Sequence, residues 1–295
     1  MPTRRVMLES VAHRQRRQGA VPQDHGVKLL IRELEVPIRR LPSGMTGLRV
    51  AHVSDLHLRR WSRRWQRLQE TLLALDADLV AVTGDFCDRP DAWPRAAEQT
   101  RRIFEPVRPR YGLFGVIGNH DPDEFVRSMA GTHVRLLGDE VVTVSAAGGG
   151  VLNLAGVAQI DVGHGDMAKC LSAADPAKPT IMLAHYPSVV HFLPPGAVDL
   201  LLTGHTHGGQ WRFPIVGCLW PQDWIPRPLA LGTHNVNGTL LHVSAGVGIA
   251  GPLWCRLNCP AEVSVLRLLP AGSAVTPSGY GDRPDPGPPQ PSGRS

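Results

Sequence analysis

Short apolar runs that end in groups of aspartate, asparagine and histidine constrain the fold of this chain more than any other feature of its sequence. Five such runs are present: Leu48–Val53, Leu79–Thr83, Leu113–Ile117, Thr180–Ala184 and Val198–Thr203. Continuous apolar or β-branched runs of this length are typical of strands buried on both faces. Helical patterns at Trp65–Leu75 and Ala92–Phe104 separate the first three runs. The polar groups therefore fall at strand carboxyl ends, where open α/β sheets bind ligands.

The second half of the chain has further strand-like runs and few convincing helices. These runs are Val141–Ser145, Val151–Val157, Leu240–Val243 and Val263–Leu268. The order of the runs predicts an α/β fold built as a four-layer α/β/β/α sandwich, with two mixed β-sheets flanked by helices. Gly148-Gly149-Gly150 lacks the spacing and the lysine of a phosphate-binding loop. We therefore expect a turn between two strands there.

The polar groups spread from Asp55 to His207 and must converge on one site, which favours a single domain. A chain of 295 residues with 42% hydrophobic residues can supply the core of such a domain. We place it at residues 27–270. Residues 1–26 are polar and basic, and residues 271–295 are rich in Pro, Gly and Ser, so we expect both to be disordered tails. Five cysteines at irregular spacing predict free thiols.

The side chains in the polar groups have the chemistry of a metal site. They are Asp55, His57, Asp85, Asp88, Asn119, His120, Asp121, His185, His205 and His207. The two carboxylate oxygens of Asp85 can bridge two cations, and the neutral amide of Asn119 limits the negative charge. A ligand set of nitrogen and oxygen without thiolate suits manganese, iron, zinc, cobalt or nickel. Two such ions about 3.5–4 Å apart can activate water for attack on a phosphorus centre, so the pattern predicts phosphoester hydrolysis.

Glycines precede two of the candidate ligands. Gly84 lies before Asp85, and Gly118 lies before Asn119. Because glycine has no side chain, the backbone and a metal ion can approach each other closely at these two places. His52, by contrast, lies inside the first apolar run, which favours a core histidine over a ligand.

The complete set of groups closely resembles the motifs of the calcineurin-like metallophosphoesterase superfamily, which are D-x-H, G-D-x-x-D, G-N-H-D/E, H and G-H-x-H. The resemblance implies two metal sites that share Asp85. The first would comprise Asp55, His57, Asp85 and His207, and the second Asp85, Asn119, His185 and His205. It also implies that His120 is a catalytic group that stabilises the phosphoryl oxygens and protonates the leaving group. Asp88 would orient His120, and Asp121 is a second candidate that could equally be structural.

Two segments of this chain resemble one branch of the superfamily more than the others. They are 204–210 and 243–248, which read GHTHGGQ and VSAGVG. The branch consists of bacterial phosphodiesterases, including membrane-associated enzymes and a UDP-diacylglucosamine pyrophosphate hydrolase. The resemblance thus implies a phosphodiesterase that cleaves a phosphoester or pyrophosphate bond by attack of a hydroxide between the metals. Two alternatives stay open: a non-catalytic metal-binding scaffold of the same fold, and a nuclease. The single arginine cluster and the mixed charge elsewhere do not favour nucleic acid as a partner.

Two apolar segments near the motifs raise the question of a membrane. Trp61, Trp65, Leu68 and Leu72 fall at helical spacing among Arg60, Arg63, Arg64 and Arg67, and Trp211, Phe213, Leu219, Trp220, Trp224 and Ile225 follow His207. Peripheral contact with a membrane, or a lipid-linked phosphoester substrate, is one interpretation. Ordinary core packing is the favoured one. No run has the length of a membrane-spanning helix or of the apolar part of an export signal, so we expect a cytoplasmic protein.

Overall fold

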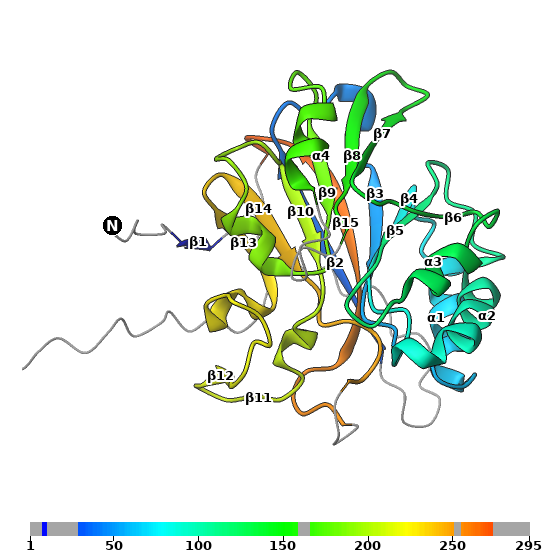
Figure 1. The fold of residues 1–295 in the computed structure, drawn as a ribbon. Coiled ribbons are helices and arrows are strands. Elements are labelled where there is room, and N and C mark those ends of the chain that lie inside the picture. The colour runs from blue at the N-terminus through cyan, green and yellow to red at the C-terminus, as the bar shows by residue number, and fades with distance from the viewer. Residues whose placement is uncertain (1–7, 11–28, 159–165, 251–254, 274–295) are drawn as a thin grey trace, which may run out of the picture.

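Two large mixed β-sheets form the centre of the computed structural model, which describes residues 8–10, 29–158, 166–250 and 255–273 (Figure 1). The seven-stranded sheet has the order β1 (Leu8–Ser10), β13 (Gly232–Val236), β14 (Thr239–Val243), β10 (Leu200–Thr203), β9 (Thr180–Leu183), β8 (Val151–Gly156) and β7 (Glu140–Ser145). The six-stranded sheet has the order β2 (Leu29–Ile38), β15 (Ala261–Pro270), β3 (Arg49–Val53), β4 (Leu79–Thr83), β5 (Leu113–Val116) and β6 (Val134–Leu136). A separate pair comprises β11 (Arg212–Phe213) and β12 (Gly217–Cys218).

The five apolar runs that precede the polar groups are strands, as predicted. They are β3, β4 and β5 in one sheet and β9 and β10 in the other, and neighbours among them are parallel. In the register, Val53 of β3 lies opposite Val82 of β4, and Thr83 of β4 lies opposite Val116 of β5. The carboxyl ends of these strands are therefore level, and the side chains that follow them can meet.

Helices cover the outer faces of both sheets, which confirms the four-layer arrangement. On the six-stranded sheet, the apolar side chains of α1 (Arg63–Ala74), α2 (Trp93–Phe104) and α3 (Asp123–Ser128) share a core with β3, β4 and β15. The other outer face packs against α4 (Met167–Ala173) and the 3-10 turns η3 (Pro187–His191) and η5 (Arg227–Ala230). Between the sheets lies a third apolar core drawn from both. Shorter 3-10 turns are η1 (Ser43–Met45), η2 (Pro90–Ala92) and η4 (His207–Gly209).

The apolar stripe on α1 packs into the protein. Trp65, Leu68 and Leu72 are buried against the six-stranded sheet. Trp61 is partly buried, and the guanidinium carbon of Arg102 lies 3.6 Å from the centre of its ring. Core packing, the interpretation that the sequence favoured, is confirmed for this segment.

The structure also contains elements that the sequence did not predict. The strands β2, β6 and β13 and the helices α3 and α4 are among them. The strand β1 lies within the predicted basic tail and pairs with β13. Most residues of both predicted tails lie outside the described residues, so their disorder stays a prediction. The three glycines 148–150 form the turn between β7 and β8, as predicted, and all five cysteines are free thiols.

Candidate metal centre

The backbone turns sharply where the candidate ligands leave their strands. Asp55, His57, Asp85, His205 and His207 all have positive φ, at 52°, 47°, 53°, 66° and 51°. Positive φ is uncommon outside glycine, and aspartate, asparagine and histidine tolerate it better than most residues. Each such residue costs of order 1–3 kcal/mol, and such residues cluster at functional sites. The left-handed turns direct several polar side chains to one place beyond the strand ends.

Backbone hydrogen bonds extend the pairing of β3 and β4 through the first two motifs. The N–H groups of Asp55 and His57 donate to the carbonyl oxygens of Gly84 and Asp85, at 3.1 and 2.8 Å. The next N–H, that of Leu58, donates to Phe86 O at 2.8 Å. Because these loops are held like strands, the two motifs keep a fixed distance from each other.

Two glycines of the site leave no room for a larger side chain. Gly84 has a φ of +83°, and a Cβ there would lie 2.5 Å from His185 Nδ1. A Cβ on Gly118 would lie 2.2 Å from Asp85 Oδ1. Both distances are far below van der Waals contact, so any larger residue would displace a candidate ligand.

The candidate ligands and His120 form three overlapping groups, two of which contain Asp85. Within each group the nitrogen and oxygen atoms lie within 4.8 Å of one another: Asp55, His57 and His207 form the first, Asp85, His185 and His205 form the second, and His57, Asp85 and His120 form a third that links these two. Asp85 Oδ2 lies 3.5 Å from His57 Nε2 in the first group and 3.4 Å from His185 Nε2 in the second. Asn119 Oδ1 lies 3.2 Å from the same nitrogen of His185. All seven residues predicted as ligands are therefore brought together, four from one sheet and three from the other.

The geometry of these atoms fits metal ions. His57 Nε2 and His207 Nε2 lie 3.0 Å apart, and His205 Nδ1 lies 3.2 Å from His185 Nε2. Ligand atoms about 2.0–2.2 Å from one ion lie roughly 3 Å apart when the angle between them is near 90–110°. Asp55 Oδ2 is buried without a hydrogen-bond partner among the described residues. A buried carboxylate oxygen without a partner is costly, and a cation would compensate it.

In two of the histidines, a hydrogen bond to a backbone carbonyl oxygen determines which ring nitrogen can bind a metal. His185 donates its Nδ1–H to Thr83 O at 2.8 Å, and His205 donates its Nε2–H to Gln222 O at 2.8 Å. The remaining nitrogen of each ring points into the site. Such second partners are the usual means of orienting histidine ligands.

Burial controls the protonation of the histidines. It lowers the pKa of His57 to about 4 and that of His205 to about 4. Burial also holds the pKa of His207 well below its ordinary value. Burial acts in the same direction on His185, but the charge of Asp85 outweighs it and raises the pKa to about 10. Three of the four imidazoles thus favour the neutral, metal-binding form, and a cation would replace the proton on the fourth.

His120 lies at the edge of this site. Its Nδ1–H donates to the main-chain carbonyl oxygen of Asp88 at 2.6 Å, and its backbone N–H donates to Asp85 Oδ1 at 3.0 Å. Its ring lies edge-on to that of His57, with centroids 4.9 Å apart. The sequence predicted that a carboxylate orients His120, but the contact comes from the backbone of Asp88. The Asp88 carboxylate instead lies 2.6 Å from Arg59 Nε.

Asp121 connects the loops that follow β4 and β5. Its carboxylate accepts hydrogen bonds from the backbone N–H groups of Gly118, Phe86 and Cys87, at 2.9, 3.2 and 2.8 Å. Burial raises the pKa of Asp121 to about 6, and the nearby charge of Asp85 acts in the same direction. These contacts support the structural role over an orienting one.

Arg256, which was not predicted from the sequence, lies behind His207. Its Nη2 is 3.3 Å from His207 Nδ1 and donates to the carbonyl oxygens of Gly246 and Gly248. Arg256 belongs to none of the metal-binding motifs. Only its fixed position against the loop 244–248 reveals that it supports the site.

Known proteins carry the same motifs. The sequence profile described as "Calcineurin-like phosphoesterase" matches residues 48–209. A "Transmembrane protein with metallophosphoesterase domain" from Bos taurus is 32% identical over 263 residues, which cover 81% of this chain and 56% of the relative. "Uncharacterized metallophosphoesterase YkoQ" from Bacillus subtilis is 27% identical and covers 69% of this chain and 77% of its own length. "UDP-2,3-diacylglucosamine pyrophosphatase LpxG" from Chlamydia muridarum is 23% identical, with coverages of 78% and 87%.

The match to the cattle protein, and to a zebrafish protein of the same description, spans about half the length of those relatives. No helix among the described residues of this chain is long and apolar enough to cross a membrane. The profile match covers all five motifs, and the residues that carry them converge on one site. The chain therefore belongs to the calcineurin-like phosphoesterase family.

Proposed function

We propose that this protein is a phosphodiesterase that uses two divalent metal ions to hydrolyse a phosphoester or pyrophosphate bond. The position of Asp85 between two groups of ligand atoms is the observation that carries the proposal. When bound, two such ions polarise the phosphoryl group and lower the pKa of a water molecule. Manganese, iron, zinc and cobalt all suit the nitrogen and oxygen donors of the site.

The ligands divide into two sets under this proposal. The first ion is held by Asp55, His57, Asp85 and His207, and the second by Asp85, Asn119, His185 and His205. The short contacts within each group support the division. Asp85 would belong to both sets, and ions held there would supply charge to a phosphate bound at the site.

His120 is the proposed catalytic group outside the two sets. Its bond to the Asp88 carbonyl oxygen assigns the proton to Nδ1 and directs Nε2 away from that backbone. A protonated Nε2 can stabilise the phosphoryl oxygens and then transfer its proton to the leaving alkoxide. Asp88 acts here as a positioning residue through its main chain.

Metal removal and reloading test the proposal. Wild-type protein should hydrolyse bis-p-nitrophenyl phosphate, lose this activity with EDTA and regain it with Mn²⁺, Zn²⁺, Co²⁺ or Fe²⁺. Asp85→Ala should lose bound metal and activity together, because one side chain serves both ions. Wild-type protein that binds metal but cleaves no phosphoester would favour the scaffold hypothesis, and faster cleavage of DNA than of small diesters would favour a nuclease.

We also propose that the substrate is amphiphilic and that the region around β11 and β12 contacts a membrane. Large apolar side chains are exposed there: Ile215, Val216, Leu219, Trp220 and Trp224. Trp220 and Trp224 are 74% and 93% exposed, and tryptophan suits the boundary between water and lipid. The same segment reaches the metal centre, because Gln222 O accepts the hydrogen bond from His205. Figure 1 shows β11 and β12 beyond one end of the two sheets.

Sedimentation with liposomes tests this contact. Wild-type protein should bind vesicles, and Trp220→Ser/Trp224→Ser should bind them at least several-fold less. Leu73→Ser is the matched control, because Leu73 is 51% exposed on α1. Equal binding by the double variant and by wild type, or no binding by either, would refute the membrane contact. Neither outcome would contradict the proposal that the protein is a metal-dependent phosphodiesterase.

A further inference from the structure

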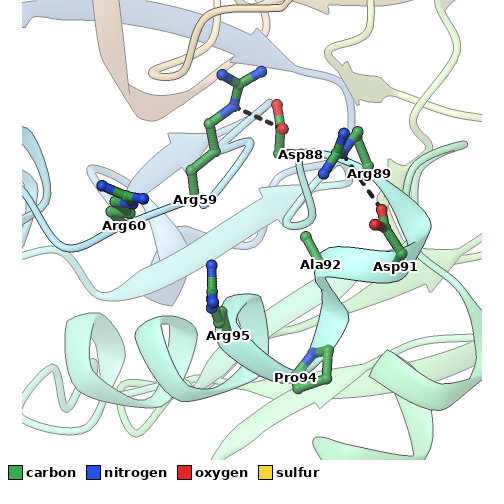
Figure 2. A pocket seen from close by; sticks show the side chains of 8 residues that line it. All are labelled: Arg59, Arg60, Asp88, Arg89, Asp91, Ala92, Pro94 and Arg95. Atoms are coloured by element: carbon green, nitrogen blue, oxygen red, sulfur yellow. Dashed lines mark ion pairs between the residues drawn. The ribbon is translucent and has the colours of Figure 1, made fainter.

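A basic pocket lies beside the metal centre and takes no part in holding the metals. It is a cavity of about 560 Å³ that opens to solvent between the loop after β3 and the segment joining β4 to α2 (Figure 2). Four arginines and two aspartates are among its lining residues, which are Arg59, Arg60, Asp88, Arg89, Asp91, Ala92, Pro94 and Arg95. The lining therefore carries two more positive than negative charges.

The two aspartates pair with only two of the arginines. Arg59 Nε lies 2.6 Å from Asp88 Oδ2, and Arg89 Nε lies 3.4 Å from Asp91 Oδ1. In the described part of the chain, no ion pair involves Arg60 or Arg95. In Figure 2, Arg95 projects from α2 into the space between the two loops. Two guanidinium groups around one concave surface thus remain available to an anion.

The walls of the pocket are fixed to the scaffold. Gln99 of α2 donates from Nε2 to the backbone carbonyl oxygen of Arg59 at 3.1 Å, which holds the loop after β3 against the helix. The first turn of α2 contains Pro94, and its amino end adds partial positive charge to this side of the pocket. A guanidinium on such a frame loses less freedom on binding than one on a mobile loop.

Asp88 both lines the pocket and contacts His120. The backbone oxygen of Asp88 accepts the Nδ1–H of His120, and the carboxylate of the same residue lines the pocket. Arg59, which pairs with that carboxylate from the loop after β3, lies two residues after His57. An anion in the pocket would therefore belong to the part of a substrate that extends past His120, on the leaving-group side.

We propose that this pocket binds a phosphate monoester carried by the substrate on the leaving-group side of the scissile bond. The proposal rests on the proposed phosphodiesterase function and deepens it by naming a second charged group that the substrate carries. Arginine suits this role, because its planar set of N–H donors matches the oxygens of a phosphate. Arg60 and Arg95 would set specificity without contributing to the chemical step.

The test is a pair of substrates that differ by one phosphate. Methyl 4-(2-hydroxyethyl)phenyl phosphate and its derivative phosphorylated on the hydroxyethyl group share the same scissile bond between phosphorus and the phenolic oxygen, and the added monoester lies on the leaving phenol. Wild-type protein should release the phenol with a kcat/KM about tenfold higher for the phosphorylated form, mostly through KM, as expected for charge-assisted hydrogen bonds at a partly exposed site. Arg60→Ala/Arg95→Ala should abolish this preference and leave kcat for the other substrate within about twofold, since neither arginine touches the reacting atoms.

Arg108→Ala/Arg110→Ala is the charge-matched control, because both arginines are exposed on the loop after α2 and neither lines the pocket. It should keep the preference. Equal kcat/KM for the two substrates in wild type, or a preference that survives in Arg60→Ala/Arg95→Ala, would overturn the proposal. Hydrolysis of bis-p-nitrophenyl phosphate distinguishes a failure of the pocket proposal from a failure of the proposed function. If wild-type protein does not cleave this diester, the proposed function itself is wrong.

Discussion

One methyl group at position 118 should damage the metal centre. A Cβ on Gly118 would lie 2.2 Å from Asp85 Oδ1 and 2.6 Å from Asp85 N. Ordinary contacts are about 3.4–4 Å, so the overlap exceeds roughly 1 Å and Asp85 must move. That oxygen also accepts the backbone N–H of His120 at 3.0 Å. The shift therefore disturbs the shared ligand and the proposed catalytic group together.

The magnitude follows from this overlap. Overpacking of a well-packed site costs about 1–3 kcal/mol of stability, which lowers the Tm of a domain of this size by roughly 2–10 °C. A displacement of about 1 Å in an active site can cost about 10²-fold in rate. We therefore expect Gly118→Ala to fold, to bind less metal than wild type and to lose about 10²-fold in kcat.

The assay combines three measurements on one preparation: metal content by mass spectrometry, hydrolysis of bis-p-nitrophenyl phosphate, and the thermal transition. Gly138→Ala is the control, because a Cβ there has no atom within 4 Å. It should match wild type in all three. If Gly118→Ala keeps two metals per chain and an activity within about threefold of wild type, the steric argument is refuted.

Further variants probe other parts of the structure. His120→Asn should keep both metals and lose about 10²–10⁴-fold in kcat, and a fall in metal content would show that His120 is a ligand. Glu262→Ala should lower the free energy of unfolding by about 3–5 kcal/mol in denaturant titrations, because it removes the buried partner 3.1 Å from Arg32. Burial holds the pKa of His52 well below 6.5, so below pH 6.5 the unfolded chain binds a proton that the folded chain does not. Stability should therefore fall as the pH drops below that value, and His52→Gln should reduce the slope by up to about 1.4 kcal/mol per pH unit.

Whether a strand could be predicted from the sequence depended on whether one or both of its faces are buried. The strands β4 and β10 consist of apolar residues and a final threonine, and all their residues are buried. The strand β2 alternates instead, with Leu34, Val36 and Ile38 buried and the intervening Glu35 and Pro37 only partly buried. A search for continuous apolar runs finds the first kind and misses the second.

The candidate ligands were predictable because each is a side chain with metal-binding chemistry placed next to a buried strand. The contact that orients His120 was not, because the acceptor is the main-chain oxygen of Asp88, and a backbone oxygen carries no signature in the residue type. Arg256 was missed for a related reason. Arg256 supports the site through its contact with His207. That contact depends on how the loop 244–248 folds.

The metal centre and the neighbouring pocket are built from different parts of the fold. This difference suggests how substrate specificity can change while the catalysed reaction stays the same. The proposed metal ligands follow strands whose register fixes them, so substitutions near them, such as Gly118→Ala, should reduce kcat for every substrate. Apart from the buried Asp88, the pocket is lined by exposed or half-buried side chains of loops and of the first turn of α2. Loss of Arg60 or Arg95 therefore costs the scaffold little and should alter only the ratio between substrates. A family built this way can keep one metal centre and accept different leaving groups through the loops after β3 and β4.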